Sequence, residues 1–124
     1  MKFKIGFGYD VHQLKNNCKL MIGGIEVPHS KGSFGHSDAD VLIHSICDAI
    51  LGASNLRDIG FHFSDKDPKF KGIDSKILLS KTISLIKNKN FSIGNIDTTI
   101  VLEKPKIINF IPKMKSILSK LLDI

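Results

Sequence analysis

The stretch SDADVLIHSICDAILGA (residues 37–53) carries the clearest helical pattern in the chain, and the other elements can be placed around it. Ser37 followed by Asp40 is an S-x-x-D signal close to a capping box, which marks a helix start. Gly52 lies where such a helix would end, near residue 53. The pattern predicts a helix whose apolar side chains pack inward: Val41, Leu42, Ile46, Ala49 and Ile50.

Three polar residues of this helix share one face. Asp40, His44 and Asp48 are spaced four residues apart, so their side chains stack along the helix. A histidine among apolar neighbours is often a hydrogen-bonded core residue, but His is also the commonest metal ligand. A metal-bound imidazole passes its second N–H to an oxygen acceptor, and Asp48 is placed to accept it. Both interpretations of His44 stay open at this point.

The N-terminal stretch GFGYDVHQL (residues 6–14) adds a second pair of polar residues. In an extended backbone, residues two apart share a face, so Asp10 and His12 point the same way. The pair could ligate a metal, form an ion pair or have no function. Together with His44 it makes a set of two histidines and one carboxylate. Three protein ligands with an open fourth position are typical of a catalytic zinc.

Two further segments carry polar clusters. The segment GHSDAD (35–40) offers His36, Ser37 and backbone N–H groups at a helix start, where a phosphate could bind. An ordinary capped helix also explains it. The segment RDIGFHFSDKDP (57–68) places three Asp residues beside Phe61 and Phe63, and a solvated loop with turn residues explains that pattern. Neither cluster alone favours a binding site.

The remaining patterns alternate between strands and helices. We expect strands over residues 2–9 and 95–103, and an extended pair over 19–28 that turns at Gly23-Gly24. A second helix follows Asp74, with an apolar stripe, and a third begins near Asn109. Residues 29–37 and 56–73 are expected loops. This order indicates a sheet covered by helices, α+β or α/β, that one more strand would complete.

Composition narrows the classes of function. The 124 residues are 42% hydrophobic and 24% charged, which predicts one folded domain over 1–124. The net charge is +6, but 17 of the 18 basic residues are Lys and Trp is absent, which argues against nucleic acid. No apolar run is long enough to span a membrane, and no signal peptide is evident. We expect a cytoplasmic protein with reduced Cys18 and Cys47.

Several segments, taken in order, resemble one enzyme family. GYDVHQL (8–14), GGIEVPHSKGSFGHSDADVLIHSICDAILGA (23–53), LRDIGFHFSDKDPKFKGIDS (56–75) and GNIDTTIVLEKPKI (94–107) resemble 2-C-methyl-D-erythritol 2,4-cyclodiphosphate synthases of the non-mevalonate isoprenoid pathway. The resemblance implies an α+β fold with a mixed sheet and helices on one face, in two layers. It also implies conversion of 4-diphosphocytidyl-2-C-methyl-D-erythritol 2-phosphate to the cyclodiphosphate with release of CMP, a phosphorus–oxygen lyase reaction.

The resemblance also assigns roles to residues of this sequence. It implies a zinc ion, one per chain, on Asp10, His12 and His44, with Asp40 and Asp48 behind these ligands and no protein nucleophile. The implied substrate-binding residues are His36 and Ser37 at phosphate; Asp58 and Gly60 at the methylerythritol hydroxyls; Phe63, Ser64, Asp65 and Asp67 in the same region; and Leu102, Lys106 and Ile107 at cytosine.

Partners and a second metal follow from the same resemblance. The family is homotrimeric, with active sites shared between subunits, and uses a second divalent cation, Mg²⁺ or Mn²⁺. Its members continue into a Thr-rich strand whose Glu holds that cation, and this sequence contains no such segment. We therefore expect a C-terminally incomplete chain. The alternatives are a non-catalytic zinc- or nucleotide-binding remnant of this family and, less favoured for want of a water-activating carboxylate, a zinc hydrolase.

Overall fold

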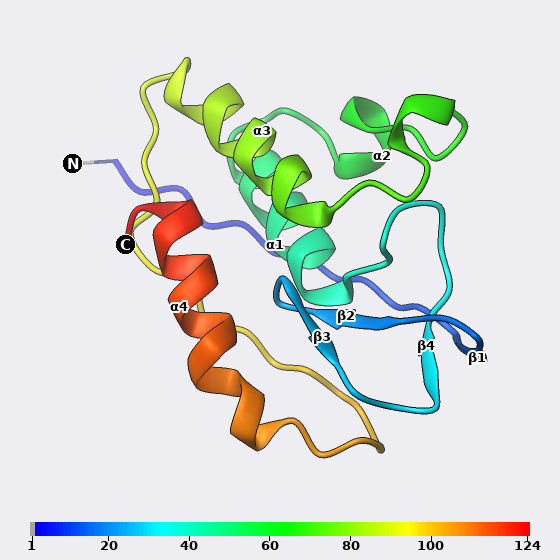
Figure 1. The fold of residues 1–124 in the computed structure, drawn as a ribbon. Helices are drawn as coiled ribbons and strands as arrows, with labels where there is room; N and C mark the ends of the chain where they lie inside the picture. The colour runs from blue at the N-terminus through cyan, green and yellow to red at the C-terminus, as the bar shows by residue number, and fades with distance from the viewer. Residues whose placement is uncertain (1) are drawn as a thin grey trace.

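Two packed helices lie at the centre of the computed structural model, which describes residues 2–124 (Figure 1). They are α1 (Val41–Ala53) and α3 (Ser75–Lys87). The third long helix, α4 (Ile111–Leu122), packs against α3. The shorter elements are α2 (Ile59–His62), the 3₁₀ turns η1 (Pro68–Phe70) and η2 (Ile108–Phe110), and the strands β1 (Leu14–Asn16), β2 (Leu20–Ile22), β3 (Ile25–Val27) and β4 (Lys31–Ser33).

The three predicted helices are confirmed, with one change at the start of α1. Asp40, not Ser37, is the N-cap, and its carboxylate accepts a hydrogen bond from Ile43 N. The helix cannot start earlier because Ala39 has a positive φ of 56°. Helix α3 is capped by Asp74, as expected, and α4 follows the 3₁₀ turn that contains Asn109.

Asp40 also joins α1 to the predicted hairpin. The hairpin forms as β2 and β3, with Ile22 opposite Ile25, and it turns through Gly23 and Gly24 at positive φ. Both glycine N–H groups donate to the Asp40 carboxylate, at 3.0 and 2.8 Å. Because Asp40 is fully buried, its carboxylate satisfies three backbone donors that have no access to water.

The core lies between α1, α3 and the β2–β3 hairpin. Ile43, Leu51 and Leu79 have no exposed surface, and Ile22 and Val27 are 1% exposed. The stripe predicted on the second helix points into this core: Leu78, Leu79, Thr82, Ile83 and Ile86 are all buried. Met114 and Leu122 of α4 close the core from the side.

The α+β class is confirmed, but the single mixed sheet differs from the structure. The described strands form two separate antiparallel pairs, β1 with β4 and β2 with β3. The β1–β4 pair lies partly within a segment expected to be a loop, and the expected loop 56–73 contains α2 and η1. Residues 2–9 and 95–103 are not strands, because within residues 2–124 neither finds a backbone to pair with.

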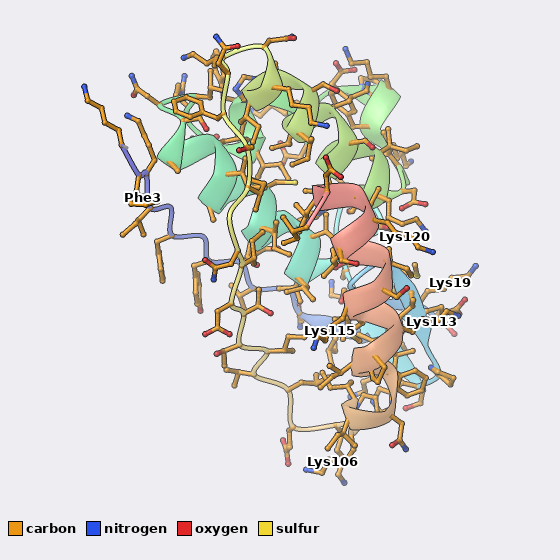
Figure 2. All side chains as sticks on the ribbon, turned by 90° about the vertical axis from the view of Figure 1, so that its left-hand side faces the viewer. Phe3, Lys19, Lys106, Lys113, Lys115 and Lys120 are labelled. Carbon is orange, nitrogen blue, oxygen red and sulfur yellow. The ribbon has the colours of Figure 1, made fainter. Side chains whose placement is uncertain are left out.

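The N-terminal segment presents one apolar face to solvent. Alternate side chains of residues 3–11 are 70–94% exposed: Phe3, Ile5, Phe7, Tyr9 and Val11. Val101, in the other unpaired segment, is 94% exposed. Figure 2 shows Phe3 on this segment, while Lys113, Lys115 and Lys120 follow α4. All three lysines are exposed on α4, apart from the apolar side chains of the N-terminal segment.

Two smaller observations complete the description. None of the helices found in residues 2–124 has the length and apolar character needed to cross a bilayer. Cys18 and Cys47 are both free thiols. Burial raises the pKa of the Cys47 thiol to about 12, which makes it an inert core residue.

We predict that Asp40→Ala lowers the free energy of unfolding by about 3 kcal/mol, because it removes a helix cap and leaves two further buried N–H groups unpaired. Urea denaturation measures the change. Asp74→Ala is the matched control. Asp74 caps α3 through Lys76 N and also forms a partly exposed ion pair with Lys76 Nζ, so its loss should cost about 1 kcal/mol. Equal losses in the two variants would contradict the role given to Asp40.

Candidate metal centre

Asp10, His12 and His44 come together in the structure. The Asp10 Oδ2 atom lies 2.8 Å from His12 Nε2 and 3.3 Å from His44 Nδ1, and the two ring nitrogens are 3.3 Å apart. One ligand atom from each residue falls within 4.8 Å of the others, an arrangement that can hold a metal ion. The side chains are between 12% and 23% exposed, so the set is largely buried but still reached by solvent.

The outward ring nitrogens of both histidines are already occupied. His12 Nδ1 lies 3.2 Å from the Phe34 carbonyl oxygen, which can only accept, so Nδ1 carries the hydrogen. His44 Nε2 lies 2.9 Å from Ser75 Oγ and 3.1 Å from Ser37 Oγ. In the neutral rings, His12 Nε2 and His44 Nδ1 are therefore free to offer lone pairs to the centre of the set.

Asp10 supplies the negative charge, and the polar atoms that face its buried Oδ2 are the ring nitrogens of His12 and His44. Burial alone would raise the Asp10 pKa, but His12 and His44 outweigh it through hydrogen bonding and charge, and lower the pKa to about 2. The hydrogen bond to Asp10 raises the pKa of His12 despite its burial. An ionised carboxylate and two inward ring nitrogens favour a positive charge between them. The donor set of two nitrogens and one oxygen fits a divalent metal.

Two glycines allow the N-terminal segment to reach α1. A Cβ atom at Gly8 would overlap the carbonyl oxygen of Ser45, and one at Gly6 would overlap that of Ala49. Residues 6–8 therefore lie directly on the backbone of α1, which brings Asp10 and His12 beside His44. The sequence pattern placed Gly6 and Gly8 within an expected strand over residues 2–9. The G-x-G spacing just before D-x-H was the signal that could have revealed this contact.

Asp48 and Asp40 do not contact the metal set as expected. Asp48 accepts a hydrogen bond from Ile59 N at 2.8 Å, which fastens α2 to α1 and leaves it without a hydrogen bond to His44. Burial raises the pKa of Asp48. Asp40 holds the β2–β3 turn. The expectation that Asp48 accepts the second N–H of His44 is therefore wrong, because the Ser75 and Ser37 hydroxyls occupy that position.

His36 and Ser37 link the metal set to the following loop. Ser37 Oγ contacts His44 Nε2 and accepts from Ala39 N. His36 Nε2 donates to the Asp67 carbonyl oxygen at 2.9 Å, and the His36 carbonyl accepts from Gly72 N. These bonds hold residues 64–72 next to the start of α1. The structure thus brings both polar clusters of the sequence to the same side of the metal set.

The remaining predicted site residues fall in two groups. The first group lies in the loop that α2 and η1 occupy. Asp58 caps α2, Gly60 is inside it, and Phe63 contacts Phe70 edge to face. Ser64 Oγ accepts from Lys66 N, Asp65 is exposed and Asp67 caps η1. The second group is Leu102, Lys106 and Ile107. Across residues 2–124, no hydrogen bond or ion pair connects the second group to the metal set.

Sequence reasoning missed Asp38 and Ser75. Ser75 is the first residue of α3, has no exposed surface, and bridges His44 to the Asp38 carboxylate. It lies 31 residues from His44 in the chain. No local spacing could have paired them, although both belong to quoted segments, GHSDAD and GIDS.

The fold and the site define an α+β protein with a carboxylate–histidine set suited to a divalent metal. The chain belongs to the YgbB family, whose model matches residues 3–124. Similar curated proteins from Bacteroides fragilis and Porphyromonas gingivalis are named 2-C-methyl-D-erythritol 2,4-cyclodiphosphate synthase. They are 56% and 53% identical to this chain over 124 and 122 residues, covering 100% and 98% of it and 78% and 75% of their own lengths.

Solved structures agree with these relatives. A structure of 2C-methyl-D-erythritol-2,4-cyclodiphosphate synthase matches 98% of this chain and 81% of its own, at a TM-score of 0.92 and 31% identity. A Plasmodium falciparum IspF in a CDP complex matches 98% of this chain and 74% of its own, at a TM-score of 0.81 and 37% identity. The family resemblance seen in the sequence is thereby confirmed.

We predict that Gly8→Ala lowers the free energy of unfolding by about 1–3 kcal/mol, because its methyl group must push the segment away from the Ser45 carbonyl. Urea denaturation measures this as well. Gly52→Ala is the matched control: it lies in α1 with no atom within 4 Å of its added Cβ, and should stabilise the protein by about 0.5 kcal/mol. A Gly8→Ala protein as stable as the wild type would rule out the close contact.

Proposed function

We propose that this chain converts 4-diphosphocytidyl-2-C-methyl-D-erythritol 2-phosphate to 2-C-methyl-D-erythritol 2,4-cyclodiphosphate with release of CMP. The observation that carries the proposal is the convergence of Asp10, His12 and His44 in a chain whose relatives bear the name of that synthase. In this reaction an oxygen of the substrate's 2-phosphate attacks the β-phosphorus, and the bond from that phosphorus to the CMP oxygen breaks. No protein nucleophile is needed.

Zinc is the metal that the ligand set fits best, since two imidazoles and one carboxylate leave a fourth position open. When bound, zinc would supply a Lewis acid that draws charge from a phosphate oxygen. The residues of the chain orient the three ligand side chains. Phe34 and Ser75 fix the two imidazole rings from outside, and Gly6 and Gly8 fix the Asp10–His12 segment on α1.

Ser37 is suited to hold the phosphate beside that position. Its oxygen receives the Ala39 N–H and faces the His44 Nε2–H, so its own hydroxyl hydrogen remains available. It can donate this hydrogen to a phosphate oxygen without losing either contact. His36 spends Nε2 on the Asp67 carbonyl, which leaves Nδ1 as its remaining polar atom. Two acidic phosphates brought together need such donors around them.

The α2 loop is suited to the methylerythritol part of the substrate. Asp58 is exposed and caps α2, and Asp48 fixes the neighbouring Ile59 N–H from below. A carboxylate held in this way accepts hydrogen bonds from sugar-alcohol hydroxyls. Gly60 leaves the space beside Asp58 open. Residues 63–67 belong to the same part of the proposed site, and His36 holds Asp67 in place there.

A second divalent cation, Mg²⁺ or Mn²⁺, is expected from the family resemblance. In the part of the chain that the structure describes, Asp10, His12 and His44 are the single set of three or more acidic, His or Cys residues with convergent ligand atoms. A second set of this kind is not found among these residues, so the second cation is expected to rely on the phosphates of the substrate.

We also propose a homotrimer in which the segment with Leu102, Lys106 and Ile107 binds cytosine at the metal set of a neighbouring copy. Two observations support this arrangement. That segment makes no hydrogen bond to the metal set of its own chain within residues 2–124. The exposed side chains of Phe3, Ile5 and Phe7 also form an apolar surface suited to contact between copies.

Zinc binding and CMP release test the proposed activity. Purified protein should hold about one zinc ion per chain and release CMP from the diphosphocytidyl substrate when Zn²⁺ and Mg²⁺ are present. We expect His44→Ala to lower the zinc affinity by more than the roughly 10–100-fold that is typical when a supporting residue is lost. His29→Ala, which changes an exposed histidine outside the set, should retain it. Zinc retained in full by His44→Ala would defeat the ligand assignment, and zinc without CMP release would favour the non-catalytic remnant.

Light scattering tests the proposed trimer. The wild type should have a mass of about 41 kDa, three times the chain mass of 13.7 kDa. Ile5→Asp should dissociate it, because a carboxylate would be buried against apolar neighbours. Ile77→Asp, at an exposed position on α3, should leave the mass unchanged. A wild type of 13.7 kDa at micromolar concentration would contradict the trimer.

A further inference from the structure

A buried hydroxyl and a carboxylate lie behind His44. Ser75 Oγ is 2.9 Å from His44 Nε2 and donates its hydrogen to Asp38 Oδ1. The Ser75 backbone N–H also donates to the other oxygen of Asp38, at 3.0 Å. These contacts connect the start of α3 with the residues before α1, and they place the Asp38 carboxylate behind the serine that contacts the His44 ring.

The number of hydrogens on these groups decides which one donates in each contact. A serine hydroxyl has one hydrogen, and the ionised Asp38 carboxylate can only accept. Because Ser75 gives that hydrogen to Asp38, its oxygen faces His44 as an acceptor. His44 must then carry a hydrogen on Nε2, which leaves the lone pair of the neutral ring on Nδ1, the nitrogen that faces Asp10 and His12.

Asp38 is itself held rigidly. Its Oδ1 accepts from Asp40 N at 3.2 Å, and its own backbone N–H donates to the Ile73 carbonyl at 3.1 Å. Helix α3 does not need Asp38 as its cap, because Asp74 fills that role through Lys76 N. Asp38 Oδ2 satisfies the first N–H of α3, and beyond these backbone contacts the Asp38–Ser75 pair contacts the ring of His44.

We propose that Asp38 and Ser75 are positioning residues that hold the His44 ring with Nδ1 unprotonated and aimed at the metal position. The proposal rests on the metal site put forward above. A ligand whose ring and tautomer are fixed before the metal arrives loses less freedom on binding, and supporting residues of this kind change metal affinity by about 10–100-fold. Ser37, at 3.1 Å from the same nitrogen, holds the ring less closely.

Zinc affinity of the Ser75→Ala protein tests the proposal. Titration with Zn²⁺ against a coloured chelator should show an affinity about tenfold below the wild type, the lower end of the usual range, because Ser37 still faces Nε2. Ser54→Ala is the matched control. Ser54 is also a buried serine, but its hydroxyl bonds the Ile50 carbonyl at the far end of α1, so the zinc affinity should not change. Equal affinities in the two variants would overturn the proposal.

Asp38→Asn provides a second variant. The Asp38 oxygens accept one backbone N–H each, from Asp40 and from Ser75, and an amide can accept at only one of them. We expect Asp38→Asn to weaken zinc binding at least as much as Ser75→Ala. Wild-type zinc affinity in Asp38→Asn would exclude Asp38 from the positioning pair.

A metal-free measurement separates this proposal from the proposed function. Nitrogen NMR of the imidazoles, at a pH where the rings are neutral, reports which nitrogen of His44 carries the hydrogen. The wild type should show the hydrogen on Nε2, and Ser75→Ala should show a mixture. If the wild type binds no zinc, the metal site fails, while the Nε2 hydrogen would still support the positioning pair. A wild-type His44 protonated on Nδ1, or no change in Ser75→Ala, would overturn it.

Discussion

Direct contact between the glycine-containing N-terminal segment and the backbone of α1 is the constraint on which the metal centre depends. Asp10 and His12 come from a segment without backbone hydrogen bonds of its own in residues 2–12, so hydrogen-bonded pairing does not place it. Gly6 and Gly8 place it instead, because each lacks the atom that would strike a helix carbonyl. A side chain at either position would move the carboxylate and the imidazole away from His44 together, since both follow in the same short stretch.

In this placement, the two ring nitrogens of each histidine have different roles. Each histidine of the set gives one ring nitrogen to the protein and keeps the other for the centre: Phe34 takes that of His12, and Ser75 that of His44. The protein thus fixes the rings from outside and leaves a negative carboxylate and two lone pairs inside. A site of this kind is arranged for a cation before any cation is present, which limits the reorganisation needed for binding.

Local patterns were sufficient for the parts of the fold that depend on neighbours in the chain. The apolar period located α1, although its cap is Asp40 and not Ser37, and Asp74 located α3. The i, i+2 spacing of Asp10 and His12 and the helical position of His44 were enough to suggest a shared site. Local spacing failed where distant backbone decided the outcome. Asp48 lies one turn from His44, but the arrival of Ile59 N gives its carboxylate another donor, and Ser75 comes to His44 from 31 residues away.

The same limit explains the unpaired segments. Alternating residues over 2–9 do indicate an extended chain, but a strand is a relation between two backbones, and no sequence pattern supplies the second. The two parts of the proposed site are therefore held in different ways. On the proposed function, the three zinc ligands and Ser37 come from one chain, where helix caps, glycine contacts and buried hydroxyls hold them. The cytosine side rests on residues 102–107, which have no such contacts with the metal set of their own chain. Metal binding should therefore depend mainly on the fold of the single chain, and nucleotide binding on how copies assemble.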